Sequence, residues 1–303
     1  MPGPKRVLVT GGAGFVGSHV VDAFLAREAE VLVVDDLSTG LAENVDGAAT
    51  FERLDIVDGA ALSGVAKGFR PDIVCHLAAQ ASVTASVRDP RRDFDVNVVG
   101  TLNVCELGAP IVFASTGGAL YGDSAALPAG EDTPEQPLSP YGASKLAGEA
   151  YVQTWARIYD RPSVVLRLGN VYGPRQNPHG EAGVVAIFSE HLLAGETPTV
   201  YGDGEQTRDY IHVSDVARAF VLAAEPGRSG TYNVGTGRET SVNELLRLMQ
   251  EAAGTSLEPR YEPLRPGELL RSALSWSLIR DELGWSPEVD LREGLAGTLR
   301  SYG

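Results

Sequence analysis

The sequence predicts an α/β protein in which a doubly wound parallel sheet is followed by a smaller C-terminal α/β lobe. Six short runs are predicted strands, and most of them are rich in Val, Ile and Leu and apolar along their length, as strands covered on both faces are. Segments with helical spacing of apolar residues separate several of these runs, which favours parallel strands joined by helices. After residue 173 the strands become shorter, and Gly, Pro and Arg interrupt them.

The domain bounds and the individual strands and helices are predicted from the spacing of apolar residues and from capping residues. We expect residues 1–171 to form the sheet domain and residues 172–303 the smaller lobe, with 209–235 packing back on the sheet. Ser214 and Ser241 precede two helical patterns of the second half and are predicted to cap them. The predicted strands are 5–10, 30–36, 49–55, 71–79, 109–116 and 162–170, and the predicted helices of this half are 15–27, 58–69, 91–107 and 139–159.

The composition and charge of the chain limit the kinds of molecule that it is expected to bind. A net charge of −15 disfavours binding to nucleic acid or to anionic membranes. No apolar run approaches the roughly 20 residues of a membrane helix, and no cleavable leader precedes the first strand, so we expect a cytoplasmic protein. Cys75 and Cys105 lie in apolar segments and are predicted to be buried free thiols, with no metal site.

A glycine turn between the first strand and the first helix indicates a dinucleotide site. Gly11, Gly14 and Gly17 allow a pyrophosphate to approach the backbone, where the helix start offers free amides. Asp35 ends the second strand and is placed to accept hydrogen bonds from the adenosine ribose. A carboxylate there repels a 2′-phosphate, and 34–40 contains no Lys or Arg, so the pattern favours NAD over NADP. Asp55 and Ile56 are predicted to flank the adenine.

Tyr141 and Lys145 lie four residues apart at the start of a predicted helix, and so project from one face. A phenol with a pKa near 10 is a weak base at neutral pH. The Lys145 ammonium and an oxidised nicotinamide are expected to favour the phenolate, which makes Tyr141 a candidate general base. A hydroxyl-rich segment, 113–122, ends the fifth strand at the same edge of the sheet.

These motifs together resemble the extended short-chain dehydrogenase/reductases, and within them the NAD-dependent nucleotide-sugar 4-epimerases that act on UDP-glucose and UDP-galactose or on UDP-glucuronate. The resemblance covers nearly the whole chain and includes TGGAGFVGSHV, HLAAQASV, NVVGT, SPYGASK, GNVYGPRQ, YGDGEQTRDYIHVSDVA, YNVGTGRETSV and RPGE. It implies a Rossmann domain and a lobe that binds the UDP-sugar. A homodimer is also implied.

The resemblance implies an inversion at carbon 4 through a transient 4-keto sugar. Tyr141 would take the proton of the 4-hydroxyl, and Lys145 would hold the nicotinamide ribose and tune Tyr141. The family usually has a Ser or Thr at the position of Gly117, so Thr116 is our first candidate for the assisting hydroxyl and Ser115 our second. The cofactor-binding residues so implied are Gly11, Gly14, Phe15, Val16, Gly17, Asp35, Asp36, Asp55, Ile56, Leu77, Ala78, Ala79, Asn97, Tyr141 and Lys145.

On the substrate side, the resemblance assigns the diphosphate to Asn170, Arg208 and Arg265, and the uridine ribose to Glu268. Arg175 could reach a carboxylate on sugar carbon 5, so a uronate and a neutral hexose both stay open. The substrate-binding residues so implied are Thr116, Gly117, Tyr141, Asn170, Arg175, Val184, Tyr201, Arg208, Arg265 and Glu268.

Other reactions on this fold are alternatives. Related 4,6-dehydratases carry an Asp-Glu pair after the Thr, and UDP-uronate decarboxylases carry a glutamate in the same segment. Residues 117–120 here are Gly, Gly, Ala and Leu, which do no acid–base work and favour epimerisation. A UDP-N-acetylhexosamine 4-epimerase, a 4-keto reductase and a silent NAD-binding regulator complete the alternatives; regulators of this type typically lack the Tyr–Lys pair.

Overall fold

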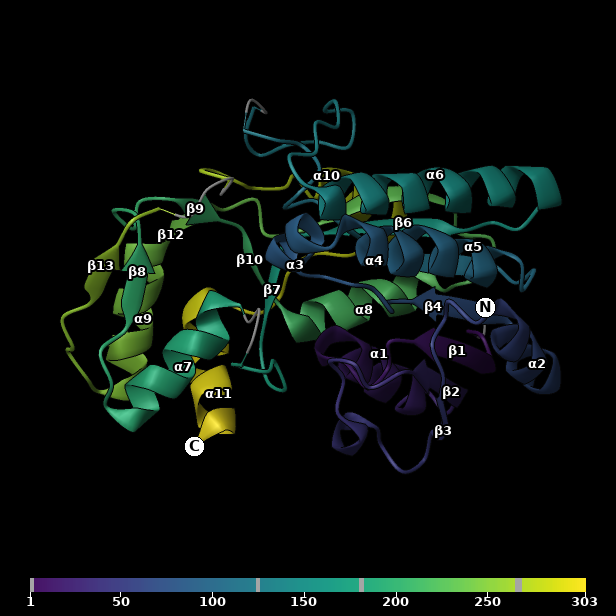
Figure 1. The fold of residues 1–303 in the computed structure, drawn as a ribbon, viewed down its shortest axis with the longest axis horizontal. Coiled ribbons are helices and arrows are strands. Elements are labelled where there is room, and N and C mark those ends of the chain that lie inside the picture. Colours follow the sequence, from purple (N-terminus) through teal and green to yellow (C-terminus); the bar gives the residue numbers. More distant parts are fainter. Residues whose placement is uncertain (1–2, 124–125, 180–182, 265–268) are drawn as a thin grey trace.

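A seven-stranded parallel sheet forms the centre of the larger domain, with the strand order β11-β6-β5-β4-β1-β2-β3 (Figure 1). The structure is a computed structural model that describes residues 3–123, 126–179, 183–264 and 269–303. The strands are β1 (Arg6–Thr10), β2 (Glu30–Asp35), β3 (Thr50–Arg53), β4 (Ile73–His76), β5 (Ile111–Thr116), β6 (Val164–Leu168) and β11 (Gly230–Val234).

Helices cover both faces of this sheet because every central strand is apolar on both sides. One core contains Val7 and Val9 of β1 together with residues of α1 (Phe15–Leu25), α8 (Val213–Ala223) and α10 (Ser277–Leu283). The other contains Leu8, which points to the opposite face. Its helices are α2 (Gly59–Phe69), α5 (Gly100–Cys105) and α6 (Pro140–Tyr159). The doubly wound sheet predicted from the sequence is confirmed.

Helix α6 begins where its sequence predicts. The Ser139 side chain accepts a hydrogen bond from the Gly142 amide at 3.2 Å, and Pro140 occupies the first turn, where no amide is needed. This start places Tyr141 and Lys145 in the first two turns, next to the carboxyl ends of the strands.

The predicted helix 91–107 is less regular. It consists of α4 (Pro90–Phe94), a π-helical turn η2 (Asp95–Val99) and α5, preceded by the short α3 (Val83–Arg88). The π turn contains Asn97, whose side chain is part of the site described below. Single π turns inside helices often mark such positions.

The smaller lobe, on the left in Figure 1, has a core of its own that includes Phe188, Leu245 and Leu295. Three two-stranded ladders join β7 to β10, β9 to β12 and β8 to β13. The remaining elements of the second half of the chain are β7 (Asn170–Tyr172), α7 (Val184–Ala194), β8 (Thr199–Tyr201), β9 (Thr207–Arg208), β10 (Tyr210–His212), β12 (Thr240–Ser241), α9 (Val242–Ala253), β13 (Arg260–Glu262) and α11 (Leu291–Tyr302). The first domain also contains the short helix η1 (Ala42–Asn44).

The structure corrects two expectations. The sequence predicted six strands in the sheet, but Gly230–Val234 adds a seventh beside β6. Helix α8 begins after His212, not at Ser214, because the His212 side chain accepts a hydrogen bond from the Ser214 amide. Ser241 does cap α9, as predicted. Cys75 and Cys105 are buried free thiols, also as predicted.

Over the described ranges of the chain, none of the helices has the length and apolar character needed to cross a bilayer.

Candidate active site

The glycine turn after β1 is shaped by close backbone packing. Gly11 has φ +72°, and a Cβ on it would lie 2.5 Å from the Ala78 amide nitrogen. A Cβ on Gly17 would lie 2.0 Å from the Gly11 carbonyl oxygen. Gly14 precedes α1 in extended conformation, and no side chain caps that helix. The first amides of α1 are therefore available to an anion such as a pyrophosphate.

Asp35 is fixed beside this turn by two amides. Its Oδ2 accepts from Ala13 N at 3.0 Å and its Oδ1 from Leu37 N at 2.9 Å. Burial raises the pKa of this carboxyl, and the amide hydrogen bonds from Leu37 and Ala13 counteract the rise. Each oxygen retains acceptor capacity that a ribose hydroxyl can use. The predicted place of Asp35, at the end of β2 and next to the glycine turn, is what the structure has.

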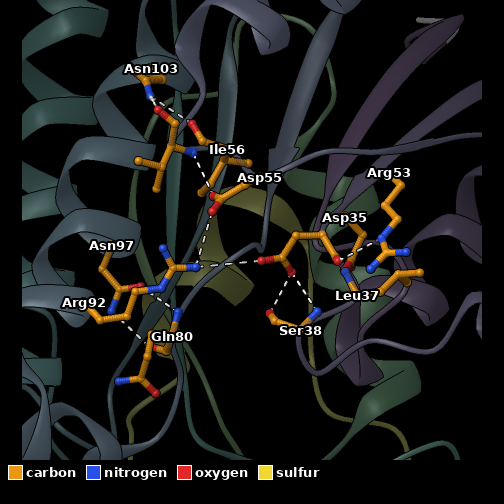
Figure 2. Close-up of polar contacts among 12 residues, drawn as sticks. Asp35, Leu37, Ser38, Arg53, Asp55, Ile56, Gln80, Arg92, Asn97 and Asn103 are labelled. Carbon is orange, nitrogen blue, oxygen red and sulfur yellow. Dashed lines mark hydrogen bonds and ion pairs between the residues drawn. The ribbon is translucent and has the colours of Figure 1, made fainter.

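Figure 2 shows the neighbouring strand ends, where an adenine would lie. Asp55 Oδ1 accepts from Val57 N at 2.9 Å, and the Asn103 amide donates to the Ile56 carbonyl at 2.8 Å. The sequence reasoning missed Arg92 of α4, whose Nη2 lies 3.3 Å from Asp55 Oδ2 and 3.9 Å from Asp36 Oδ2. Arg92 thus links the ends of β2 and β3 to α4.

The remaining predicted cofactor contacts gather at the same edge. Leu77, Ala78 and Ala79 follow β4, and the Ala78 amide donates to Thr10 Oγ1 at 3.3 Å. Phe15 and Val16 form the first turn of α1, where the Phe15 ring packs edge-on against His19.

Asn97 anchors the π turn to its surroundings. Its Oδ1 accepts from Gln80 N at 2.9 Å, as Figure 2 shows. Its Nδ2 donates to the Gln80 carbonyl at 2.9 Å, to Asp93 Oδ1 at 3.1 Å and to Ser144 Oγ at 3.0 Å. Ser144 in turn donates to the Tyr141 carbonyl at 3.0 Å. Asn97, which the resemblance places in the cofactor site, is therefore connected through Ser144 to the backbone of Tyr141.

The side chains of Tyr141 and Lys145 point into the protein at this edge of the sheet. The Lys145 side chain is buried, with Nζ 4.7 Å from the centroid of the Phe113 ring on β5. Burial lowers the pKa of Lys145 to about 8, and the nearby Asp93 and Glu149 carboxylates limit the fall. Lys145 is thus a cation that can lose its proton close to neutral pH.

The pKa of Tyr141 differs from the sequence-based expectation. Burial of the phenol raises it to about 12, a hydrogen bond with Thr116 lowers it, and the charge of Asp93 raises it further. We expected Lys145 to make this phenol more acidic, but among the described residues only Thr116 and Asp93 shift its pKa besides burial, and Lys145 does not. Activation of Tyr141 near neutral pH therefore needs a further positive charge, which an oxidised nicotinamide carries.

The structure separates the two candidate hydroxyls. Thr116 is the hydrogen-bond partner of the Tyr141 phenol. Ser115 points elsewhere, since its Oγ donates to Glu149 Oε1 at 2.5 Å. Glu149 follows Tyr141 by eight residues on α6 and lies on the same helix face. That spacing was the signal that the sequence reasoning passed over.

Glu149 belongs to a buried charged cluster under the site. Arg167 of β6 binds both oxygens of Glu149, with Nε at 3.0 and 3.1 Å and Nη2 at 2.7 Å. Arg167 also donates to Glu135 Oε1 at 2.5 Å and to the Tyr121 hydroxyl at 3.0 Å. Desolvation works against the guanidinium, but the Glu149 carboxylate keeps the pKa of Arg167 above its ordinary value. The cluster therefore fastens the segment before α6 to the sheet.

The segment after β5 is closely packed where relatives carry a hydroxyl. A Cβ on Gly117 would lie 2.5 Å from Leu274 Cδ1, and one on Gly118 would lie 3.3 Å from Asn170 Oδ1. Gly117 therefore leaves room for Leu274, and Asn170 of β7 lies beside this turn.

The predicted substrate residues are only partly brought together. Val184 begins α7, Tyr201 ends β8 and Arg208 ends β9, all in the smaller lobe. Arg175 Nη2 lies 2.7 Å from Asp22 Oδ2 of α1, so its guanidinium is paired on the first helix. Arg265 and Glu268 lie outside the described residues.

A cleft of about 640 Å³ opens elsewhere, at the amino-terminal edge of the sheet, between the end of α2 and the start of β5. Arg6, Lys67 and Arg161 are among its lining residues, and Tyr141 and Lys145 are not. The candidate chemistry lies at the opposite edge, where ligands of doubly wound sheets bind.

Comparison with known proteins agrees with this geometry. The model of the NAD dependent epimerase/dehydratase family matches residues 7–235. A UDP-glucose 4-epimerase of Mycolicibacterium smegmatis is 48% identical over 308 residues, which cover 98% of each chain.

Two solved structures are also similar. The UDP-glucose 4-epimerase of Thermotoga maritima, solved with UDP-glucose, has a TM-score of 0.96 and 46% identity, with 98% of both chains covered. The UDP-glucose 4-epimerase of Thermus thermophilus, solved with NAD, has a TM-score of 0.92 and 48% identity over the same share of each chain. The family model covers most of the chain, and the glycine turn, Asp35 and the Tyr141–Lys145 pair are in place. The chain therefore belongs to the NAD-dependent epimerase/dehydratase family, and its cofactor is NAD.

Proposed function

We propose that this protein is a UDP-sugar 4-epimerase that interconverts UDP-glucose and UDP-galactose. The observation that carries the proposal is that Thr116, Tyr141 and the buried Lys145 lie together at the end of β5, on the sheet that carries the glycine turn after β1. The three relatives described above are each named UDP-glucose 4-epimerase, which supports UDP-glucose as the substrate.

The side chains have separate tasks in this reaction. Tyr141 takes the proton from the 4-hydroxyl and returns it after the 4-keto sugar has turned its other face. Thr116 donates a hydrogen bond to the phenolate as that charge develops, and Lys145 holds the ribose next to the nicotinamide. When bound, NAD supplies the hydride acceptor and the hydride donor for carbon 4. Gly11, the start of α1 and Asp35 would hold its pyrophosphate and adenosine ribose.

The surroundings of the site favour epimerisation over elimination or decarboxylation. Residues 117–120 carry no group that can transfer a proton. Glu149 and Glu135, the acids of the neighbouring cluster, are both engaged by Arg167. A dehydratase or decarboxylase would need a further acid or base beside the sugar, and neither of these two carboxylates is available for that work.

The position of Arg175 favours a neutral hexose. A carboxylate on carbon 5 calls for a planar fork such as a guanidinium, and Arg175 was the candidate from the sequence. Its pairing with Asp22 on α1 gives it another partner. We assign the diphosphate to Asn170, Arg208 and Arg265 and the uridine ribose to Glu268, with Val184 and Tyr201 as walls of the uracil site.

We further propose a homodimer that forms through α4 and α6. These helices pack against each other and lie on one side of the molecule (Figure 1). Phe94 of α4 is 46% exposed, and Tyr151 and Ile158 of α6 are 41% and 64% exposed. Burial of such side chains against a second copy would remove apolar surface from water. The cytoplasmic location stays a prediction.

The test is turnover of UDP-glucose, UDP-glucuronate and UDP-N-acetylglucosamine by the purified protein with NAD, followed by proton NMR. We expect UDP-galactose from UDP-glucose, with no net reduction of NAD, no carbon dioxide and no 6-deoxy sugar. Faster conversion of UDP-glucuronate would instead select the uronate substrate, and a 4-keto-6-deoxy product would contradict the proposed reaction.

A further inference from the structure

Lys145 is a buried cation that forms no ion pair with the residues that the structure describes. Its side chain is 3% exposed and its Nζ lies over the Phe113 ring. Among the residues that the structure describes, no carboxylate is close enough to form a salt bridge with it. A buried ammonium is costly without a compensating charge, so the source of that charge matters for the site.

Three titratable groups interact electrostatically with Lys145 from the elements packed around it: Glu149 on α6, His76 on β4 and Asp93 on α4. Tyr141 lies one turn earlier on α6. Burial, followed by the charge of Lys145, lowers the pKa of His76 to about 3, so this imidazole is neutral. It is held between Thr10 and Thr101 at 2.7 and 3.0 Å.

The two acids are not equivalent. Glu149 is bound through both oxygens by Arg167, so its charge is largely compensated locally. Asp93 is 1% exposed, and the donors that reach it are the neutral amides of Gln80 at 2.9 Å and Asn97 at 3.1 Å. Asp93 is therefore the acid near Lys145 whose charge no arginine balances among the described residues.

Asp93 is also connected to the catalytic helix by hydrogen bonds. Asn97 Nδ2, which donates to Asp93, also donates to Ser144 Oγ at 3.0 Å. Ser144 Oγ in turn donates to the Tyr141 carbonyl. The carboxylate thus orients Asn97, and Asn97 holds the first turn of α6 against α4.

We propose that Asp93 is a positioning residue of the catalytic site, which supplies the counter-charge of Lys145 and orients Asn97 against the start of α6. Its role in turnover rests on the proposed function, whereas its effect on Lys145 does not.

The Asp93 charge affects both catalytic groups in the same direction. The Asp93 charge raises the pKa of Lys145 and the pKa of Tyr141. Turnover needs Tyr141 without its proton and Lys145 with its proton. Removal of the charge lowers both pKa values, so both limbs of the pH–rate profile move to lower pH, by about one unit or more. A purely structural role would lower kcat and leave both limbs in place.

The first experiment measures the protonation of Lys145 directly and does not depend on turnover. The chain has only three lysines, Lys5, Lys67 and Lys145, so lysine labelled with carbon-13 at Cε gives three signals. Lys5→Arg and Lys67→Arg, at exposed positions, assign them. We expect Lys145 to titrate near pH 8 in the wild-type protein measured without NAD, and about one unit or more lower in Asp93→Asn under the same conditions.

Matched variants separate charge from fold. Asp95→Asn removes the same charge from the next turn, where no interaction with Lys145 is found, and is expected to leave the Lys145 titration unchanged. Asp93→Glu keeps the negative charge and is expected to give the same Lys145 titration as the wild-type protein. An Lys145 pKa in Asp93→Asn within about 0.3 of the wild-type value would overturn the proposal.

If Asp93→Asn does not fold, the titration of Lys145 in the wild-type protein still tests the proposal. A lysine buried this deeply without a counter-charge titrates at about pH 5–6, so a wild-type value in that range would overturn the proposal. A shifted Lys145 titration in a protein inactive on every UDP-sugar would uphold the role of Asp93 as counter-charge and refute the proposed function.

Discussion

Removal of the Thr116 hydroxyl is expected to slow turnover strongly and leave the fold intact. Thr116→Val keeps the branched shape of the side chain, and the residue is 9% exposed, so the cost in packing is small. The hydroxyl is the hydrogen-bond partner of the phenol on which negative charge develops. Loss of such a donor costs about 2.7–4 kcal/mol in the transition state, which corresponds to roughly 10²–10³ in kcat.

Ser115→Ala is the matched control, since it removes a hydroxyl one residue away. Ser115 donates to Glu149, and Glu149 keeps three contacts from Arg167, at 3.0, 3.1 and 2.7 Å, when Ser115 is changed. The carboxylate therefore stays paired. We expect a loss of about 1 kcal/mol in the free energy of unfolding and a change in kcat of less than about threefold.

The assay follows the conversion of UDP-glucose to UDP-galactose by proton NMR at saturating substrate. Thermal unfolding and bound NAD are measured on the same samples, to exclude a loss of fold or cofactor. The reasoning is refuted if Ser115→Ala is slower than Thr116→Val, or if Thr116→Val retains more than about a third of the wild-type kcat.

Two further perturbations concern the surroundings of the site. Arg167→Met leaves the buried Glu149 without its partner, which costs about 3–5 kcal/mol; at about 2.1 cal/mol/K per residue, Tm should fall by about 5–8 °C in calorimetry. The double variant with Glu149→Leu should recover part of the loss, and a single variant as stable as wild type would contradict the pairing. Arg92→Ala removes the link between α4 and the ends of β2 and β3. NAD should dissociate several-fold faster in a stopped-flow displacement assay, with Arg91→Ala at the neighbouring exposed position of α4 as control; an unchanged rate would rule out a role in retention.

Much of the sheet domain could be predicted because its signals are local. The glycine turn lies between a strand and a helix, Asp35 ends the next strand, and Ser139–Pro140 starts α6, so each element can be recognised from fewer than ten neighbouring residues. Parallel strands then bring their carboxyl ends to one edge, which is why Gly11, Asp35 and the Thr116 partner of Tyr141 lie at the same edge of the sheet.

Contacts between distant segments were harder to predict. The Arg92 link and the Asp93 carboxylate depend on how α4 packs across the sheet edge, and no spacing in the sequence encodes that. Arg175 follows a family motif, but its partner Asp22 lies more than 150 positions away on α1. Gly230–Val234 was not predicted as a strand because it begins with a glycine and contains the polar residues Thr231 and Asn233; residues 209–235 were expected only to pack back on the sheet.

The pKa of Tyr141 illustrates a different limit. Spacing predicted that Lys145 lies on the same helix face, but the balance between burial and charge depends on the surrounding packing. In the protein alone burial dominates and raises the pKa to about 12. We therefore expect the phenol to act as a base only when the oxidised cofactor adds its positive charge, so that proton removal would depend on the presence of the hydride acceptor.

The most direct test of the account is the turnover of UDP-glucose by Tyr141→Phe with NAD bound. The variant keeps the ring and loses only the oxygen that is expected to take the proton of the 4-hydroxyl. We predict unchanged thermal stability and NAD content, and a kcat lower by about 10²–10⁴. A kcat within about threefold of the wild-type value would show that another group takes the proton, and would contradict the role assigned to Tyr141.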